Sequence, residues 1–430
     1  MISLGGANLI EISLYKNFSL IILFIFLILI FKLVLNNKYL KKEIKEKNYN
    51  IEKLKKDISD KLKKAQDVHQ KMLPKKITEP EDFLFSDYYQ PAEFIGGDYY
   101  NVFPIDHGAM NAFFDQYLIY FFDVSGHGID STLLSIFIND SIENYFKLKH
   151  NPGEMVSTKE LMNYIDIQYQ NEEFPDDYLV CLFIGVLDRN DYSFTYSSGG
   201  FQYPFFKIDS NKEIKKVDIG GLPISTALGS LKDSRTEEKI KVEKNSTIFL
   251  STDGLLEQNN GQKTYYEKID GILKKYKFLP APFLKDLIRK DFYNFTDGNS
   301  GKDDITFLIL DRPAGEIKEW NLNDEKNNNE QIFAELLNII KNQNQKNSKA
   351  FLKLEDIIIA KKELLLRQKY KIKLLNNQSV LTISFENEGK DIISFKNLAS
   401  VKNEDFFQKD KIYLSKNEFN NKVHLLVRKK

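Results

Sequence analysis

Four short motifs place an aspartate beside glycine or beside a second acid, and each could contribute ligands to a metal ion. Carboxylates at rigid strand ends can converge on hard divalent cations, which prefer oxygen ligands. The neighbouring glycines allow a close backbone approach, so that a carbonyl such as that of Val124 can join the coordination shell. Taken singly, each motif is more typical of a surface turn. The motifs are Gly96-Gly97-Asp98, Asp123-Val124-Ser125-Gly126-His127-Gly128, Ser251-Thr252-Asp253-Gly254 and Lys302-Asp303-Asp304-Ile305-Thr306.

Short β-rich stretches surround these motifs and would position them. Hydrophobic residues precede the second and third motifs and follow the fourth. From about residue 83 to 310 such stretches alternate with amphipathic helices, and Arg189-Asn190-Asp191 is typical of a hairpin turn. A further α+β region begins near Pro313 and ends in a predicted strand at 422–428. The clearest strands upstream are predicted at 118–124, 179–187, 193–197 and 247–251.

Together and in this order, the motifs resemble the SpoIIE-like branch of the PPM family of metal-dependent serine/threonine phosphatases. The resemblance covers residues 63–312 and is not limited to the acids. It includes the helix leading to Leu73-Pro74, Pro91-Ala92, Tyr99-Tyr100, Ser198-Gly199-Gly200 with Pro204, Gly221-Leu222-Pro223, and Glu257 after Asp253-Gly254. The first motif alone also looks like the signature hairpin of diguanylate cyclases, but those enzymes have an acid where Tyr99 stands.

The resemblance implies an α+β fold: a PPM-type αββα sandwich with two Mn²⁺ or Mg²⁺ ions at one end. Asp123 would bridge both ions, with the Val124 carbonyl on one of them. Asp253 and Asp303 would bind the other ion, and Asp98 would hold metal-bound water. Asp98, Asp123, Asp253 and Asp303 are therefore the expected catalytic residues. Asp304 is the less expected ligand of the Asp303-Asp304 pair.

Two features depart from the family pattern. No arginine precedes Arg189, so the arginine that animal-type relatives use to hold phosphate is missing, and metals with a lysine would have to replace it. Gly200 stands where the third motif usually has histidine. His127 could donate a proton or make a structural hydrogen bond beside the bridging aspartate. The single cysteine, Cys181, is predicted to be a buried strand residue, and it permits no internal disulfide.

An apolar run at 20–31, extended by Phe18 and by 33–35, predicts a membrane anchor at 1–37. A cleaved signal peptide is the alternative, although the run lacks a small-residue cleavage site. Lys38, Lys41, Lys42 and Lys45 follow the run. The positive-inside rule therefore predicts a single-pass protein of the inner (cytoplasmic) membrane with its catalytic domain in the cytoplasm.

Residues 38–74 form a predicted helical linker. Ile44, Ile51, Ile58, Ala65 and Met72 recur every seven residues, as in a parallel coiled coil, while Lys47 and Lys61 interrupt the second seam position. This pattern predicts a homodimer formed through the linker. A solvated single helix that packs on its own domain is the other interpretation.

The C-terminal region, 313–430, is predicted to be a small α+β domain after the phosphatase domain at 75–312. It faintly resembles the histidine-kinase-like ATPase fold with a degenerate nucleotide site. Glu363 would match the family's glutamate, whereas Arg367, Asn387 and Asp391 stand where nucleotide-binding residues are expected. An unrelated α+β interaction domain is the alternative.

Lys+Arg and Asp+Glu are both 61, and this zero net charge gives no reason to expect a nucleic-acid partner. The sequence instead predicts a membrane-anchored phosphoprotein phosphatase in bacterial signal transduction. By resemblance, its substrate would be a phosphorylated regulatory protein, an anti-sigma-factor antagonist of the STAS type. A catalytically silent membrane scaffold that binds such partners is the rival hypothesis.

Overall fold

The computed structural model divides the chain into two compact units, residues 1–65 and 66–430. The residues that it describes are 5–72, 80, 82–111, 115–126, 128–231, 234–298, 303–322, 326–343, 349–362, 365, 370–376, 380–387, 399–400, 412–417 and 422–428.

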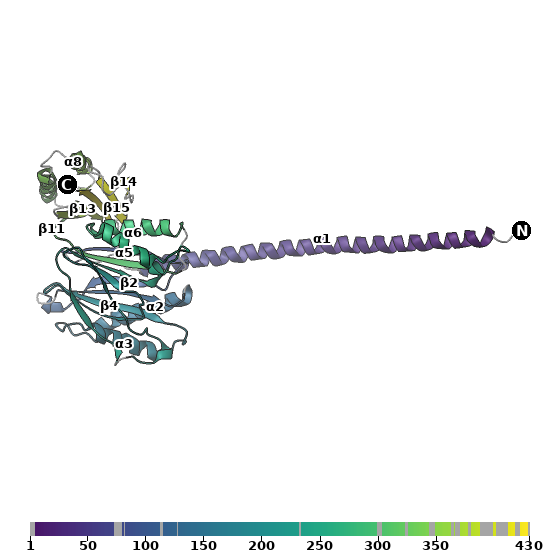
Figure 1. Ribbon diagram of the computed structural model, residues 1–430, viewed down its shortest axis with the longest axis horizontal. Helices are drawn as coiled ribbons and strands as arrows, with labels where there is room; N and C mark the ends of the chain where they lie inside the picture. Colours follow the sequence, from purple (N-terminus) through teal and green to yellow (C-terminus); the bar gives the residue numbers. More distant parts are fainter. Residues whose placement is uncertain are drawn as a thin grey trace. The chain divides into compact units, whose positions relative to one another are not determined.

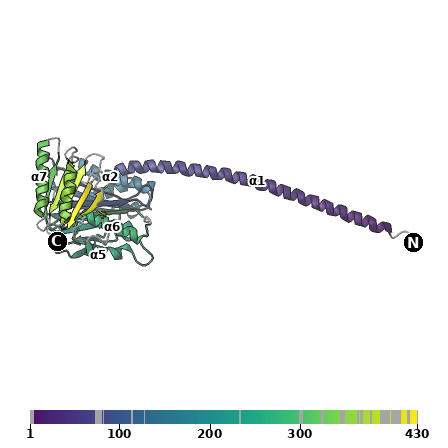
Figure 2. The same cartoon turned by 90° about the horizontal axis from the view of Figure 1, so that it is seen from above.

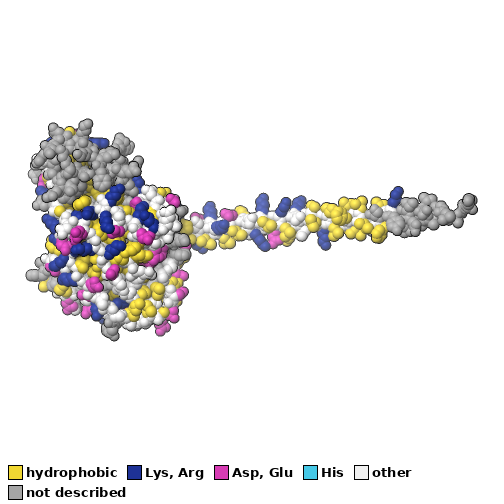
Figure 3. Space-filling view, viewed as in Figure 1, with side chains coloured by type: hydrophobic (Ala, Val, Ile, Leu, Met, Phe, Trp, Pro, Cys, Tyr) yellow, Lys and Arg dark blue, Asp and Glu magenta, His cyan; other side chains and the backbone are white. Residues whose placement is uncertain are grey.

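The predicted anchor and linker form one continuous helix, α1 (Gly5–Met72). Apolar side chains at 22–31 are exposed along it, and lysines follow them (Figure 3). Among the described residues this is the one helix long and apolar enough to cross a membrane, a test that a signal sequence near the N-terminus would also pass. The seam residues Ile44, Ile51 and Ile58 are 48–56% exposed. The coiled coil therefore stays a prediction.

The first sheet of the second unit has the strand order β2-β3-β4-β5-β8, and every neighbouring pair is antiparallel. The interior strand β3 is buried at all nine positions, which explains why the sequence there is a nearly continuous apolar run. The hairpin predicted at Arg189-Asn190-Asp191 joins β4 to β5. The strands are β2 (Tyr99–Pro104), β3 (Gln116–Val124), β4 (Val180–Asp188), β5 (Ser193–Gly199) and β8 (Glu238–Lys241).

The second sheet has the order β1-β10-β9-β6-β7 and is also antiparallel. Its edge strand β1 pairs directly with β10, although the two segments lie more than 200 residues apart along the chain. The strands are β1 (Leu84–Gln90), β6 (Phe205–Ile208), β7 (Ile214–Val217), β9 (Ser246–Ser251) and β10 (Ile305–Arg312).

Helices cover the outer faces of both sheets, so the expected αββα sandwich is confirmed (Figure 1). α2 and α3 pack on the first sheet, and α4 and α6 pack on the second. Side-chain caps mark the N-termini of two of these helices. The Ser157 hydroxyl accepts from the Glu160 N–H before α3, and Thr264 with Glu267 forms a capping box at α5. The helices are α2 (Ile129–Leu148), α3 (Thr158–Asn171), α4 (Asp253–Leu256), α5 (Tyr265–Tyr276) and α6 (Ala281–Phe295).

The C-terminal region builds a third sheet with the order β11-β12-β13-β16-β15-β14. One face carries α7 and α8 (Figure 2). Leu375, Tyr413 and Leu426 of this sheet are buried in the same core cluster as α5 and α6, so the sheet packs against the sandwich. Glu363, Arg367 and Asp391 lie outside the described residues. The elements are β11 (Glu316–Asn321), α7 (Lys326–Gln343), α8 (Lys349–Ala360), β12 (Tyr370–Asn376), β13 (Val380–Asn387), β14 (Ala399–Ser400), β15 (Ile412–Asn417) and β16 (Lys422–Arg428).

Candidate metal centre

The β2–β3 hairpin brings the first two motifs together. Tyr99 pairs with Phe122, so continuing the register by one residue sets Asp98 opposite Asp123. Asp98 is fully buried and Asp123 is 9% exposed. The antiparallel pairing therefore places two carboxylates at the same end of the first sheet, as the sequence predicted for strand ends.

The β9–β10 pair of the second sheet supplies the other two motifs. Ser251 pairs with Phe307, and the Thr252 N–H donates to the Thr306 carbonyl at 3.0 Å just beyond. Asp253 follows as the first residue of α4. Asp303 and Asp304 precede β10. The third and fourth motifs thus meet at one sheet end, although about 50 residues separate them along the chain.

Two threonines join the sheets through Asp98. The Thr252 and Thr306 hydroxyls donate to Asp98 Oδ2 at 2.9 and 2.5 Å. Asp98 Oδ1 is buried and has no hydrogen-bond partner. A buried carboxylate oxygen without a partner is costly. This arrangement orients Asp98 and leaves one oxygen available for a ligand.

Asp304 has a different environment. Its Oδ1 accepts from the Ala92 N–H at 2.7 Å, and its Oδ2 accepts from the Gly97 and Asp98 N–H groups at 2.6 and 3.3 Å. A side chain at Gly96 could not fit, because its Cβ would lie 2.1 Å from Asp304 Oδ2. Asp304 therefore fixes the loop that leads into Asp98. A ligand role for Asp303 stays a prediction.

The Val124 carbonyl lies against the glycines of the first motif. A Cβ on Gly97 would come within 2.7 Å of the Val124 oxygen and 2.9 Å of Ser131 Cβ. Glycine is thus required here for close approach of the two backbones. His127 lies outside the described residues, so its expected role is not tested.

The carboxylates raise one another's pKa values. Burial raises the pKa of Asp123 well above its usual range, and repulsion from Asp253 and Asp303 adds to this. Burial and repulsion from Asp123 likewise raise the pKa of Asp98, and burial raises that of Asp253. Among the described residues no lysine or arginine forms an ion pair with these groups. Their negative charge is therefore not neutralised within this part of the chain.

The donor set fits a divalent cation. The buried Oδ1 atoms of Asp98 and Asp253 both lack a partner, and hard cations prefer such oxygens. Nevertheless, no three Asp, Glu, His or Cys side chains among the described residues stand close enough together to form a ready-made metal cluster. The side chains of Asp123 and Asp253 already interact with each other, and a shared cation would replace the repulsion among the carboxylates by attraction. The set Asp98, Asp123, Val124, Asp253 and Asp303 stays a prediction.

Four residues near this site are not among the site residues that the sequence predicts. Thr252 and Thr306 lie inside the acidic motifs, and only the contact with Asp98 shows their role. The buried Tyr89 hydroxyl has no partner, and its pKa is raised well above its usual range by burial and then by Asp304 and Asp98. The ring of His69, near the end of α1, lies 6.2 Å from that of Tyr89.

Cys181 also lies beside the carboxylates, as the register partner of Asp123 on β4. It is half-buried rather than fully buried, on the strand where it was predicted. Burial and repulsion from Asp123 raise the pKa of its thiol. A thiol in this environment is a poor nucleophile.

Comparison with known proteins supports the same conclusion about the fold. The PP2C domain of SiaA from Pseudomonas aeruginosa aligns with a TM-score of 0.50 and 18% identity, covering 60% of this chain and 98% of that domain. Together with the paired sheets and the buried carboxylates, this defines a domain with the PP2C-type phosphatase fold.

Residues 115–313 match the family model described as stage II sporulation protein E (SpoIIE). This segment is therefore a SpoIIE-family domain, which confirms the resemblance found in the sequence. Protein IcfG of Synechocystis is 21% identical over 279 residues, which are 58% of this chain and 41% of that protein. Phosphoserine phosphatase RsbP of Bacillus subtilis is 21% identical over 253 residues, which are 58% of each chain. The chain thus spans about half the length of these relatives.

Proposed function

We propose that this protein is a metal-dependent serine/threonine phosphoprotein phosphatase whose active site is the carboxylate end of the sandwich. One observation carries the proposal: buried carboxylates from both sheets gather without a neutralising lysine or arginine among the described residues, and two of their oxygens have no partner. Only an external cation can make such a cluster favourable in its ionised form. The SpoIIE-family match and the phosphoserine phosphatase among the relatives support the activity.

Asp123, Asp253, Asp303 and the Val124 carbonyl would hold two Mn²⁺ or Mg²⁺ ions. When bound, these ions would acidify a water molecule and neutralise charge on the phosphoryl group. Asp98 would orient that water through Oδ1, because Thr252 and Thr306 already occupy Oδ2. Asp304 would keep the loop before Asp98 in place. The chain then needs no covalent nucleophile, which agrees with the poor reactivity expected of Cys181.

Hydrolysis of p-nitrophenyl phosphate by the purified protein tests this proposal. We expect activity with Mn²⁺ and none after the metal is removed by EDTA. The catalytically silent scaffold predicts no metal-dependent turnover under any condition, while binding of the partner would persist. Activity that is unchanged by EDTA would contradict both hypotheses.

The proposal also includes the protein substrate and the attachment to the membrane. The substrate would be a phosphorylated regulatory protein, an anti-sigma-factor antagonist of the STAS type. Residues 1–37 would anchor the chain in the inner membrane and residues 38–74 would form a dimeric linker. The catalytic domain, 75–312, and the C-terminal domain, 313–430, would then lie in the cytoplasm. The exposed apolar stretch of α1 and the lysines after it support this orientation.

The linker could also control the site. The end of α1 contributes His69, which is 4% exposed and packs beside Tyr89. Tyr89 in turn lies close enough to Asp98 and Asp304 for their charges to affect its pKa. We infer that a change in the register of the linker would shift the rings of His69 and Tyr89 and so alter the surroundings of the carboxylates.

A further inference from the structure

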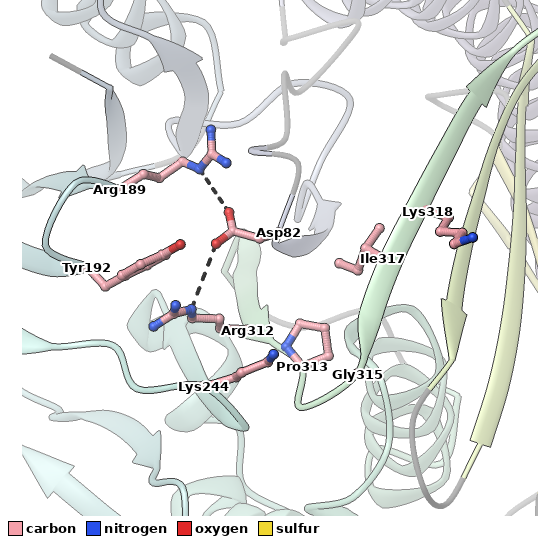
Figure 4. Close-up of a pocket in the computed structure, with 9 residues that line it drawn as sticks. All are labelled: Asp82, Arg189, Tyr192, Lys244, Arg312, Pro313, Gly315, Ile317 and Lys318. Carbon is pink, nitrogen blue, oxygen red and sulfur yellow. Dashed lines mark hydrogen bonds and ion pairs between the residues drawn. The ribbon is translucent and has the colours of Figure 1, made fainter. Parts of the chain in front are cut away.

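A second cluster of charged side chains lies at the opposite end of the sandwich from the carboxylates. It surrounds a pocket of about 360 Å³ (Figure 4). The pocket is lined by Asp82, Arg189, Tyr192, Lys244, Arg312, Pro313, Gly315, Ile317 and Lys318. β10 begins beside Asp304 and ends at Arg312, so eight strand residues, or about 26 Å, separate the two clusters.

Two arginines in this pocket are held in fixed positions. Arg189 Nε donates to Asp82 Oδ1 at 2.8 Å, and its Nη1 donates to Asp115 Oδ2 at 2.6 Å. Arg312 Nε lies 3.9 Å from Asp82 Oδ2, and its Nη1 donates to the Val242 carbonyl at 2.8 Å. The Arg312 guanidinium also stacks 3.1 Å from the centre of the Tyr192 ring. Both guanidinium groups are therefore preorganised, which lowers the entropic cost of binding a ligand.

The positive charge of the pocket exceeds its negative charge. Asp82 and Asp115 neutralise the two arginines, and the Lys318 ammonium pairs with Glu335 of α7 at 3.1 Å. By contrast, no hydrogen bond or ion pair joins the Lys244 ammonium to any residue that the structure describes. Lys244 lies in the turn before β9, where its flexible chain can follow a ligand. One net positive charge thus remains at the pocket.

The walls of the pocket come from all three sheets of this unit. Arg189 and Tyr192 lie in the β4–β5 hairpin of the first sheet, and Arg312 ends β10 of the second. Ile317 and Lys318 belong to β11, the first strand of the third sheet. A ligand here would contact the sandwich and the C-terminal sheet together, and would stabilise their junction.

We propose that this pocket binds a small molecule bearing a phosphate group, with the anion held by Lys244 and the fixed guanidinium groups of Arg189 and Arg312. Guanidinium groups match the geometry of phosphate oxygens, and a mobile ammonium adds an adjustable point charge. A volume of 360 Å³ is at the small end of ligand sites, so the ligand is a compact phosphate ester and not a dinucleotide. The site is separate from the proposed phosphatase centre and does not depend on it.

Isothermal titration calorimetry on the full-length protein in detergent tests this proposal. The probes are inorganic phosphate and pyrophosphate, and EDTA is present so that no metal at the carboxylate end can bind them. We expect saturable binding that Lys244→Glu weakens by about tenfold or more, because a charge-assisted contact is replaced by repulsion. Lys239→Glu is the matched control: this exposed lysine on β8 pairs with Asp191 and does not line the pocket.

A second variant tests whether the pocket binds the probes independently of the carboxylate end. Asp123→Asn should bind both probes as the wild type does, because Asp123 is remote from the pocket. Three outcomes would overturn the proposal: no saturable binding, equal binding by Lys244→Glu and wild type, or loss of binding in Asp123→Asn. As an independent readout, phosphate should raise the melting temperature of wild type and of Lys239→Glu but not that of Lys244→Glu.

Discussion

The two ends of the sandwich differ in how their charged side chains are neutralised. At the end where β10 begins, aspartates are buried together without a neutralising lysine or arginine among the described residues, and their pKa values are raised. At the end where β10 finishes, Arg189 and Arg312 share Asp82, and most charges are paired. The first arrangement is costly for the folded protein unless a ligand neutralises it. The second is stable without a ligand, and its Lys244 ammonium has no ion-pair partner among the described residues.

This contrast indicates that the carboxylate end carries the catalytic function. A cluster that lowers stability in its ionised form is retained only if a bound group compensates for it, whereas a paired cluster can also be structural. The carboxylate end should therefore respond strongly to single substitutions and to divalent cations. The arginine end should respond to anions and should affect turnover little.

The largest effect is expected from Asp123→Asn. The substitution removes charge from the predicted bridging ligand, and Mn²⁺-dependent hydrolysis of p-nitrophenyl phosphate should fall by roughly 10²- to 10³-fold or more. Mn²⁺ should raise the melting temperature of the wild type but not of the variant, a readout that needs no turnover. Asp188→Asn, on β4 at the other end of the first sheet, is the control with normal activity. Wild-type turnover by Asp123→Asn would contradict the two-metal assignment.

A smaller loss is expected from Thr306→Val, which keeps the shape of the side chain but removes the donor to Asp98 Oδ2. Asp98 would lose half of its orienting hydrogen bonds, and activity should decrease by roughly 10- to 100-fold. Thr306→Ser restores the hydroxyl and should recover most of the rate. Equal rates for the valine and serine variants would show that the hydroxyl does not position Asp98.

The linker variant Ile51→Asp with Ile58→Asp should produce a monomer. Like charges in the heptad seam oppose helix pairing, and the activity towards the protein substrate should fall about fivefold or more. Lys56→Asp with Lys63→Asp changes charge on the outward face of the same helix and should leave the dimer intact. Sedimentation and phosphatase assays on the same samples measure both properties. A monomeric double variant with full activity would leave the linker as a tether only.

The last effect concerns stability at the arginine end and not turnover. Burial raises the pKa of Asp311 on β10 to about 6, against the opposing influence of the nearby Lys212 and the Thr247 hydroxyl. A carboxyl with a raised folded-state pKa contributes stability that is complete below the unfolded-state value of about 3.9 and is lost as the pH rises through about 6.

Asp311→Asn, which cannot ionise, tests this pH dependence. Relative to the variant, the wild type should lose roughly 2 to 3 kcal/mol of unfolding free energy between pH 4 and pH 7. Urea denaturation across this range measures the difference, and phosphatase activity should stay the same. Parallel pH profiles for the two proteins would show that Asp311 has an ordinary pKa.

Much of the sandwich follows from local sequence, whereas the expected ligands came from the resemblance to the SpoIIE-like phosphatases. Alternating and continuous apolar runs predicted β3, β4, β5 and β9 within two residues at each end, because strand burial depends on side chains only a few positions apart. The strand predicted at 422–428 is β16. The four aspartate motifs were recognisable because each combines an aspartate with a glycine or a second acidic residue at a predicted strand end.

How those motifs contact one another depends on strand pairing between distant parts of the chain. Asp304 contacts Gly97 across 207 positions of sequence, and Thr252 and Thr306 reach Asp98 across 154 and 208. Which of two adjacent acids faces the loop depends on how β10 pairs with β1 and β9, and no local pattern contains that register. The pocket between Asp82 and Lys318 likewise exists only where three sheets meet. Local side-chain periodicity thus determined the elements, and long-range strand pairing decided which of their charges meet.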